Sequence, residues 1–223
     1  SLPLTGMVPV EWDAERIRGE IRVARDHWTK LLLLGHLFAL DVNKESQVEV
    51  MRRMLVLHLD LHEYASSLFY ANHIIELSGA KSETGQWGQI ARILVEQRSL
   101  EEGLARGMES GSYVREARDL LERLSTLKLS EELGAFSSMV RGEIRATLGA
   151  RSEARELMDE VLISSLKDPI TIKIVAAIKL REYELEADHE AIISLFEELA
   201  MSERLETVDR LRYADLLVRE IFR

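Results

Sequence analysis

The chain repeats the stretch Val114-Arg-Glu-Ala-Arg-Asp-Leu-Leu121 twice with changes, as Arg151-Ser-Glu-Ala-Arg-Glu-Leu-Met158 and as Asp188-His-Glu-Ala-Ile-Ile-Ser-Leu195. The alanine stands at residue 117, 154 and then 191, which is a spacing of 37 residues both times. A large apolar residue follows each alanine by four positions, so the small and the large side chain lie on one helical face. We therefore expect each stretch to be a helix that packs closely on a neighbour.

Other amphipathic segments lie between and after these stretches, at about 130–148, 170–186 and 203–222. Ser130 is a suitable N-cap for the first of them, and Asp168-Pro169 suits the start of the second. The unit is thus a helix, a short turn and a helix. Self-similarity at a period of 20 to 50 residues is typical of an α-solenoid.

This half resembles a tetratricopeptide repeat (TPR) array. In its middle unit, Gly142, Ala154 and Met158 fill the glycine, alanine and large apolar positions of the TPR pattern, and Pro169 lies three residues beyond the proline position. The sequence departs from the pattern at its tryptophan, leucine and tyrosine positions, which hold Ser138, Arg141 and Arg145. The resemblance covers about residues 98–222 and is shared by other helical-hairpin repeats. The segment 63–69 also resembles the second helix of such a unit, which would start the array earlier.

In TPR arrays, the first helix of each pair lines a groove that holds a peptide or a partner helix. Carried over by position, the resemblance implies that seven residues contact a partner: Glu102, Arg106, Glu109, Glu143, Lys173, Leu180 and Tyr183.

The composition favours an all-α fold. Together with the repeat, the resemblance implies antiparallel helix pairs that form a TPR-like α-solenoid, with additional N-terminal helices. Leu, Glu, Arg and Ala are abundant, and no proline occurs from Val10 to Asp168. We divide the chain into an irregular lead-in at 1–10, an N-terminal helical region at 11–110 and TPR-like repeats at 111–223. In one interpretation, the N-terminal helical region also contains degenerate repeats. One continuous domain is the alternative.

In the N-terminal region we expect a helix over 11–40 with a break near Asp26, followed by a turn at 41–43. Ser46 and Glu49 have the spacing of a capping box at the next helix start. The segment 55–64 alternates apolar and polar residues as a strand does, but its flanks are helical and the chain offers no pairing strand. We therefore interpret it as a helix or a helix–turn–helix corner. The glycines of 79–88 predict a break, with the next helix at about 89–108.

Charge and hydropathy exclude several classes of partner. The chain has 29 basic and 39 acidic residues, a net charge of −10 without a basic run, which disfavours nucleic acid. The most apolar stretch, Leu31–Leu40, would rise about 15 Å as a helix, half the thickness of a bilayer core. We expect it to be a buried helix of a soluble, cytoplasmic protein that binds no membrane. The chain has no cysteine, which excludes disulfides and thiolate chemistry.

No motif for catalysis or for a cofactor stands out, so we expect neither an enzyme nor a bound cofactor. His58 and His62 have the spacing of two ligands on one helical face, with Asp60 and Glu63 nearby. Two histidines do not make a metal site, so we assign no metal ligands and interpret them as packing or surface residues.

The function best supported by the sequence is a protein–protein interaction scaffold that binds a peptide or helix, with a basic partner favoured by the acidic charge. One alternative is a regulatory or sensor domain of a larger protein, such as a transcriptional regulator. Another is a helical metalloprotein using His58 and His62. The sequence leaves open the partner's identity, the pathway and the oligomeric state, a homodimer included.

Overall fold

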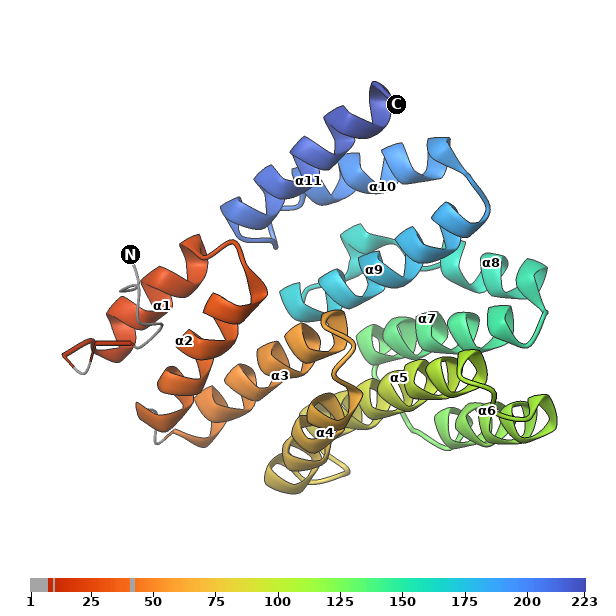
Figure 1. The fold of residues 1–223 in the computed structure, drawn as a ribbon, viewed down its shortest axis with the longest axis horizontal. Coiled ribbons are helices and arrows are strands. Elements are labelled where there is room, and N and C mark those ends of the chain that lie inside the picture. Colours follow the sequence, from red (N-terminus) through yellow and green to blue (C-terminus); the bar gives the residue numbers. More distant parts are fainter. Residues whose placement is uncertain (1–7, 10, 41–42) are drawn as a thin grey trace. The chain divides into compact units, whose positions relative to one another are not determined.

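A computed structural model describes residues 8, 9, 11–40 and 43–223 of the chain (Figure 1). In these residues the fold is all α-helical, as predicted, with eleven α-helices, one short 3-10 helix (Ile163–Ser165) and no strand. The α-helices are α1 (Ala14–Val23), α2 (His27–Leu40), α3 (Lys44–Asp60), α4 (Tyr64–Ser78), α5 (Glu83–Ala105), α6 (Ser110–Ser125), α7 (Glu131–Thr147), α8 (Arg151–Asp159), α9 (Pro169–Leu185), α10 (His189–Met201) and α11 (Thr207–Ile221). Of the expected lead-in, residues 1–7 and 10 lie outside the described residues, as do 41 and 42 of the expected turn.

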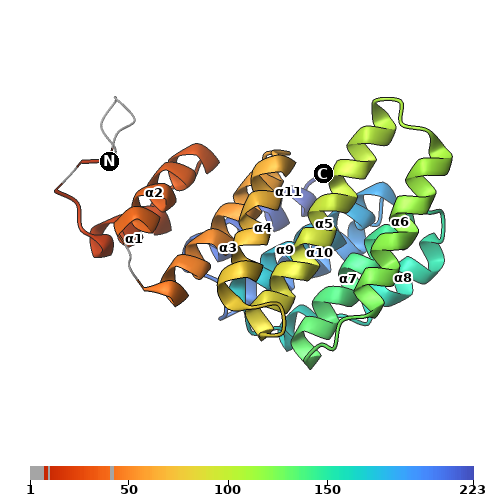
Figure 2. The same cartoon turned by 90° about the horizontal axis from the view of Figure 1, so that it is seen from below.

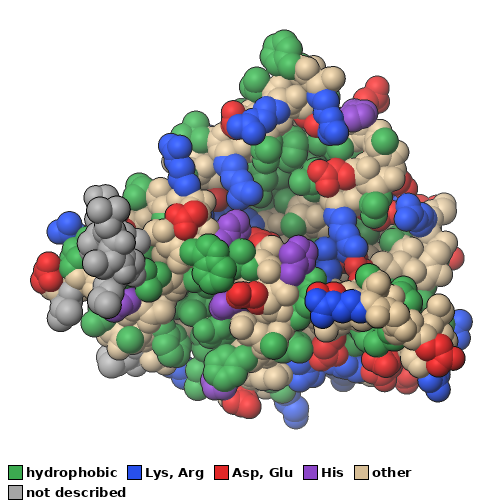
Figure 3. Space-filling view, in the orientation of Figure 1, with side chains coloured by type: hydrophobic (Ala, Val, Ile, Leu, Met, Phe, Trp, Pro, Cys, Tyr) green, Lys and Arg blue, Asp and Glu red, His purple; other side chains and the backbone are tan. Residues whose placement is uncertain are grey.

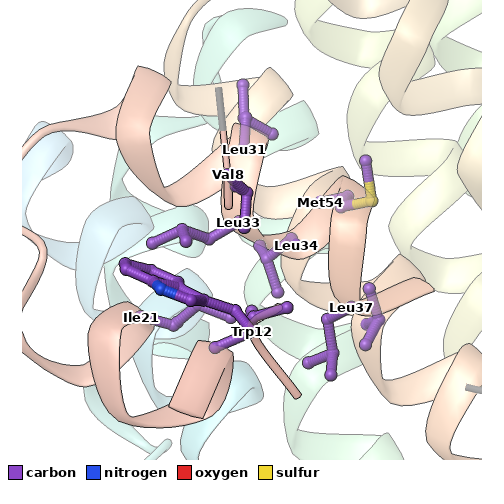
Figure 4. Close-up of a cluster of buried hydrophobic side chains, with 10 residues drawn as sticks. Val8, Trp12, Ile21, Leu31, Leu33, Leu34, Leu37 and Met54 are labelled. Atoms are coloured by element: carbon purple, nitrogen blue, oxygen red, sulfur yellow. The ribbon is translucent and has the colours of Figure 1, made fainter. Parts of the chain in front are cut away.

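The chain forms two compact units, Ser1–Val95 and Glu96–Arg223, which divide inside α5. One buried apolar cluster of the first unit lies around α2. The apolar stretch of α2 is a helix, as predicted, but it is buried on one face only: Leu31, Leu33, Leu34 and Leu37 are buried, whereas Leu40 is 51% exposed. Figure 4 shows Leu33, Leu34 and Leu37 of α2 packed with Trp12 and Met54. In the same unit, α3 packs along α4 (Figure 2).

Side-chain caps decide where the first helices begin. The predicted break near Asp26 is confirmed, because the Thr29 N–H donates to Asp26 Oδ1 at 2.7 Å and starts α2. The predicted capping box at Ser46 and Glu49 is wrong. Asn43 caps α3 instead, accepting from the Glu45 N–H at 2.9 Å, since asparagine is an equally good cap three residues earlier.

The segment 55–64 is the predicted helix–turn–helix corner between α3 and α4. The predicted helix start at about 89 is wrong, because α5 begins at Glu83 and contains Gly85 and Gly88. Ser82 Oγ accepts from the Gly85 N–H at 3.0 Å and satisfies an amide of the first turn. A Cβ at Gly88 would lie 3.0 Å from a side-chain carbon of Ile75, so this glycine allows α4 and α5 to pack closely.

Among the described residues, four helix pairs close with the same turn motif: α3 with α4, α5 with α6, α7 with α8, and α9 with α10. In each turn, a backbone N–H donates a hydrogen bond to the carbonyl oxygen five residues before it, at 2.8 to 3.0 Å between nitrogen and oxygen. The donor and acceptor residues are 63 and 58, 108 and 103, 150 and 145, and 188 and 183. The residue before that N–H has a positive φ in all four turns: His62, Gly107, Gly149 and Ala187. This is the Schellman motif, which satisfies free carbonyls at a helix end. The helix–turn–helix unit is therefore repeated in the structure as well as in the sequence.

In the second unit, the predicted close packing of the repeated helices is confirmed for the middle pair. Ala154 of α8 is fully buried, and a Cβ at Gly142 of α7 would lie 3.2 Å from the Ala154 carbonyl oxygen and from Met158 side-chain atoms. Ala117 is also fully buried, whereas Ala191 is half-buried. α7 also packs on α9, and α10 packs along α11.

Candidate functional site

Four charged side chains from three helices of the second unit form one connected cluster, and one of them is a buried carboxylate. Glu143 of α7 is only 4% exposed, and its Oε1 accepts a hydrogen bond from Arg181 Nη1 of α9 at 2.7 Å. Arg98 Nε of α5 lies 2.6 Å from the same oxygen. Arg181 Nη2 donates to Glu101 Oε2 of α5 at 2.5 Å. We call these four residues the charge cluster.

The repeated turn explains why three of these residues meet. In each of the three such turns of the second unit, one carbonyl accepts the hydrogen bond that spans five residues. The residue two positions before that carbonyl is Glu101, Glu143 or Arg181. They therefore occupy equivalent positions of successive helix pairs. Since α7 packs on α9, their side chains stack into a row, and Arg181 joins the two glutamates.

Burial and charge act against each other on Glu143. Burial raises the pKa of this carboxyl, Arg98 and Arg181 lower it, and the carboxylate of Glu101 raises it. Desolvation lowers the pKa of Arg181, but the hydrogen bonds and charges of Glu101 and Glu143 outweigh it, so the pKa is raised. The cluster combines two basic and two acidic side chains. Arg181 keeps 36% of its side chain exposed, so its guanidinium can meet an external carboxylate or carbonyl.

A neutral hydrogen-bond network continues from the cluster. Gln97 is fully buried on α5, and its amide nitrogen lies 3.2 Å from Glu101 Oε1, 3.0 Å from the Tyr113 hydroxyl and 2.9 Å from Thr147 Oγ1. These contacts tie α5 to α6 and α7. The charged residues are thus held on a rigid support rather than on a loop.

Beside the cluster, α9 presents a row of accessible residues at helical spacing, which we call the α9 stripe. Its members are Lys173, Ala177, Leu180, Arg181 and Glu184. Ala177 and Glu184 are exposed, and the other three are half-buried. The row combines an apolar centre with charges of both signs, which suits a peptide or a helix better than a small molecule.

The structure places the seven predicted contact residues in four settings. Glu102 and Arg106 form an exposed ion pair at 2.5 Å near the end of α5, and exposed Glu109 directly precedes α6. Lys173 and Leu180 share the α9 stripe, and Lys173 pairs with Asp209 of α11.

The other two predicted residues are buried. Glu143 lies in the charge cluster. Tyr183 is 5% exposed, beneath the guanidinium of Arg155, and its hydroxyl donates to Asp159 Oδ1 at 3.0 Å. Burial, more than the nearby Asp159, raises the pKa of this hydroxyl. Arg155 also pairs with Asp188 at 2.8 Å, so Tyr183 belongs to a clamp that joins α8, α9 and α10.

Three members of the cluster were missed by the sequence analysis: Arg98, Glu101 and Arg181. Aligning the three pairs on their turns brings Glu101 and Arg181 into register with Glu143, but it does not indicate Arg98. The alignment on Glu-Ala pairs compared only the second helices and left the first helices unaligned.

The two histidines considered as metal ligands do not share a helical face. α3 ends at Asp60, so His62 lies in the turn with a φ of 59°, and the helical spacing does not apply. His58 Nδ1 lies 2.5 Å from Glu63 Oε2, and His62 Nδ1 lies 2.9 Å from the Tyr64 hydroxyl. In the described part of the chain, no three His, Cys, Asp or Glu side chains are grouped as metal ligands would be.

Comparison with family models, curated proteins and solved structures finds no match to this chain. None of the helices in the described ranges is both long and apolar enough to span a bilayer.

Proposed function

We propose that this chain is a TPR-like helical-repeat scaffold that binds a peptide or a helix of another protein, and that it has no catalytic activity. The surface we assign to the partner is the α9 stripe together with the exposed part of the charge cluster. The row of Glu101, Glu143 and Arg181 carries the proposal because successive helix pairs stack in register along it, although Glu143 itself is buried and Arg181 is only half-buried. Equivalent positions that stack on successive helix pairs form the continuous surface on which repeat proteins bind extended ligands.

The turn motif shared by the four helix pairs supports the same proposal. A repeat scaffold needs each pair to present the same face, and a turn with the same hydrogen bonds ends the first helix of each pair in the same way. Three of these turns lie in the second unit, where the charge cluster is.

The chemistry of the α9 stripe indicates what the partner offers. Leu180 and Ala177 give an apolar centre for an aliphatic side chain, while Arg181 and Glu184 can pair with charges of either sign. Because the chain carries a net charge of −10, a partner segment with a basic balance would be attracted over a longer range. We therefore expect a mixed apolar and basic segment.

The test is site-specific crosslinking in extract of the source cells. A photoreactive amino acid replaces Ala177 on the α9 stripe in one protein. In a matched control it replaces Arg118, which is exposed on α6 of the same unit. We expect one dominant protein to crosslink at position 177 and not at position 118, with the crosslinked peptide identified by mass spectrometry.

The second measurement is affinity for that peptide. Ala177→Arg places a bulky cation in the stripe and should weaken binding at least about tenfold, whereas Arg118→Glu should change it less than about twofold. Equal crosslinking at both positions, or binding unaffected by Ala177→Arg, would remove the α9 stripe as the binding surface. Absence of any crosslinked protein at either position would count against the scaffold itself.

A further inference from the structure

The last helix, α11, has two faces of opposite character. One face is used inside the second unit. Asp209 pairs with Lys173, Tyr213 stacks on Phe196 of α10 at 6.3 Å between ring centroids, and Glu220 Oε1 lies 2.5 Å from His189 Nδ1.

The opposite face of α11 is apolar and exposed. Leu211 is 66% exposed, Val218 53%, Ile221 54% and Phe222, directly after the helix, 85%. Ala214 lies between them at the same helical spacing and is half-buried. Figure 3 shows hydrophobic side chains gathered at the top of the view, over the C-terminal end of this helix. We call this row the α11 stripe; its five residues are Leu211, Ala214, Val218, Ile221 and Phe222. Folded proteins rarely leave such a row uncovered, because each exposed apolar side chain is costly in water.

The α11 stripe is complementary to itself when reversed. Along the helix, the side chains of the stripe are large at Leu211, small at Ala214, medium-sized at Val218 and large at Phe222. In an antiparallel pair, Leu211 of each copy meets Phe222 and Ile221 of the other, and Ala214 meets Val218. The small side chain of Ala214 near the centre lets the two helices approach closely.

The charges beside the stripe pair in the same register. Asp215 and Arg219 lie on one flank, one turn apart, and form an exposed ion pair at 2.6 Å within the helix. In an antiparallel helix pair, the same flank of both helices meets, so Asp215 of each copy stands opposite Arg219 of the other. A parallel pair would bring opposite flanks together and lose both contacts.

We propose that the α11 stripe binds a second copy of this chain as an antiparallel helix pair, which makes the protein a weak homodimer. The proposal is independent of the proposed function, since it concerns a different surface. One helix pair buries less area than the roughly 800 Å² per partner of a standard interface, so association should be detected only at high protein concentration.

The first test is sedimentation equilibrium of the full chain from about 1 to 300 µM. We expect the mass to rise from the monomer value of 25.5 kDa towards twice that value. Val218→Glu puts a charge in the centre of the stripe and should keep the chain monomeric over the whole range. The matched control is Phe69→Glu, which replaces a side chain that is 54% exposed on α4 and should leave association unchanged. A monomer at all concentrations, or a dimer that survives Val218→Glu, would overturn the proposal.

The second test reads the direction of the helix pair. Asp215→Arg places two arginines opposite each other, Arg219→Asp places two aspartates opposite each other, and each should weaken self-association at least about tenfold. When the two variants are mixed, both contacts between position 215 of one chain and position 219 of the other join an arginine to an aspartate, so the two variants should associate. Failure of the mixture to associate would exclude the antiparallel register. Because these positions are exposed, unchanged circular dichroism melting curves should confirm that the variants fold.

Discussion

Glu143 and Arg181 occupy equivalent positions of two successive helix pairs, and a 2.7 Å ion pair joins them across α7 and α9. The contact links two helix pairs over a long range in the sequence, because the residues are 38 positions apart. Arg181 continues to Glu101, 80 positions before it. The charge cluster thus couples three helix pairs that would otherwise be joined mainly by apolar packing.

We predict that Glu143→Ala destabilises the protein by about 3 kcal/mol, because it leaves Arg98 and Arg181 without their buried carboxylate. Glu143→Gln should cost less, since the amide oxygen can still accept a hydrogen bond. The measurement is urea unfolding followed by circular dichroism. Glu184→Ala removes an exposed glutamate of α9 and should change stability by less than about 0.5 kcal/mol. Equal effects of Glu143→Ala and Glu184→Ala would mean that the cluster does not stabilise the fold.

The sequence predicted the helices better than it predicted the cluster, for a physical reason. Helix starts depend on local contacts, such as Asp26 with the Thr29 amide, and these can be read from neighbouring residues. Errors arose where two local signals competed. Asn43 capped α3 in place of Ser46, and the glycines of α5 were interpreted as a break although Gly88 serves close helix packing.

The charge cluster depends on contacts between distant helices. No local pattern marks Arg98 or Arg181, because single charged residues on acidic or mixed helices are usually solvated. Only an alignment of the helix pairs on their turns relates Glu101 and Arg181 to Glu143. These turns fix which residues are equivalent, and the turn after Arg181 has Ala187 at the left-handed position instead of glycine, so glycine does not mark every turn in the sequence.

The repeated alanine gives a second prediction. Ala154 is fully buried between α8 and α7, so Ala154→Leu should destabilise the protein by about 2 kcal/mol through overpacking. The equivalent Ala191 is half-buried, and Ala191→Leu should cost less than about 0.5 kcal/mol. Thermal unfolding of the two variants measures the difference. Similar losses of stability in the two variants would show that Ala154 and Ala191 are packed equally tightly, which would contradict their difference in burial.

The turns give a third prediction with effects of opposite sign. Gly149 has a φ of 92° and open space where a Cβ would stand, so Gly149→Ala should cost about 1 kcal/mol from backbone strain alone. Ala187 is exposed and has a φ of 53° at the equivalent place, so Ala187→Gly should stabilise the protein by up to about 1 kcal/mol. Urea midpoints of both variants provide the measurement. A loss of stability in both would show that the left-handed conformation is not what decides the residue at these turns.

The last prediction concerns Lys179 of α9, which is buried among charges from its neighbours. Desolvation lowers the pKa of its ammonium group, Asp159 and Glu198 oppose that shift, and Arg155 adds to it. Because the folded-state pKa lies below that of the unfolded chain, the unfolded chain binds the proton more tightly. The stability of the protein should therefore rise with pH between the two pKa values, and the full cost of the buried charge applies at lower pH.

Two substitutions at Lys179 should both remove this pH dependence, one by removing the charge and the other by making it permanent. Lys179→Met has no charge to bury, so it should be more stable than the wild type at pH 7, and the gain should shrink as the pH approaches the ordinary lysine value of 10.5. Lys179→Arg keeps its charge at every such pH, so its loss of stability relative to the wild type should grow over the same range. Urea unfolding at pH 7, 8, 9 and 10 measures both differences. If they stay constant with pH, the ammonium group of Lys179 titrates alike in the folded and unfolded chain, and its burial carries no electrostatic cost.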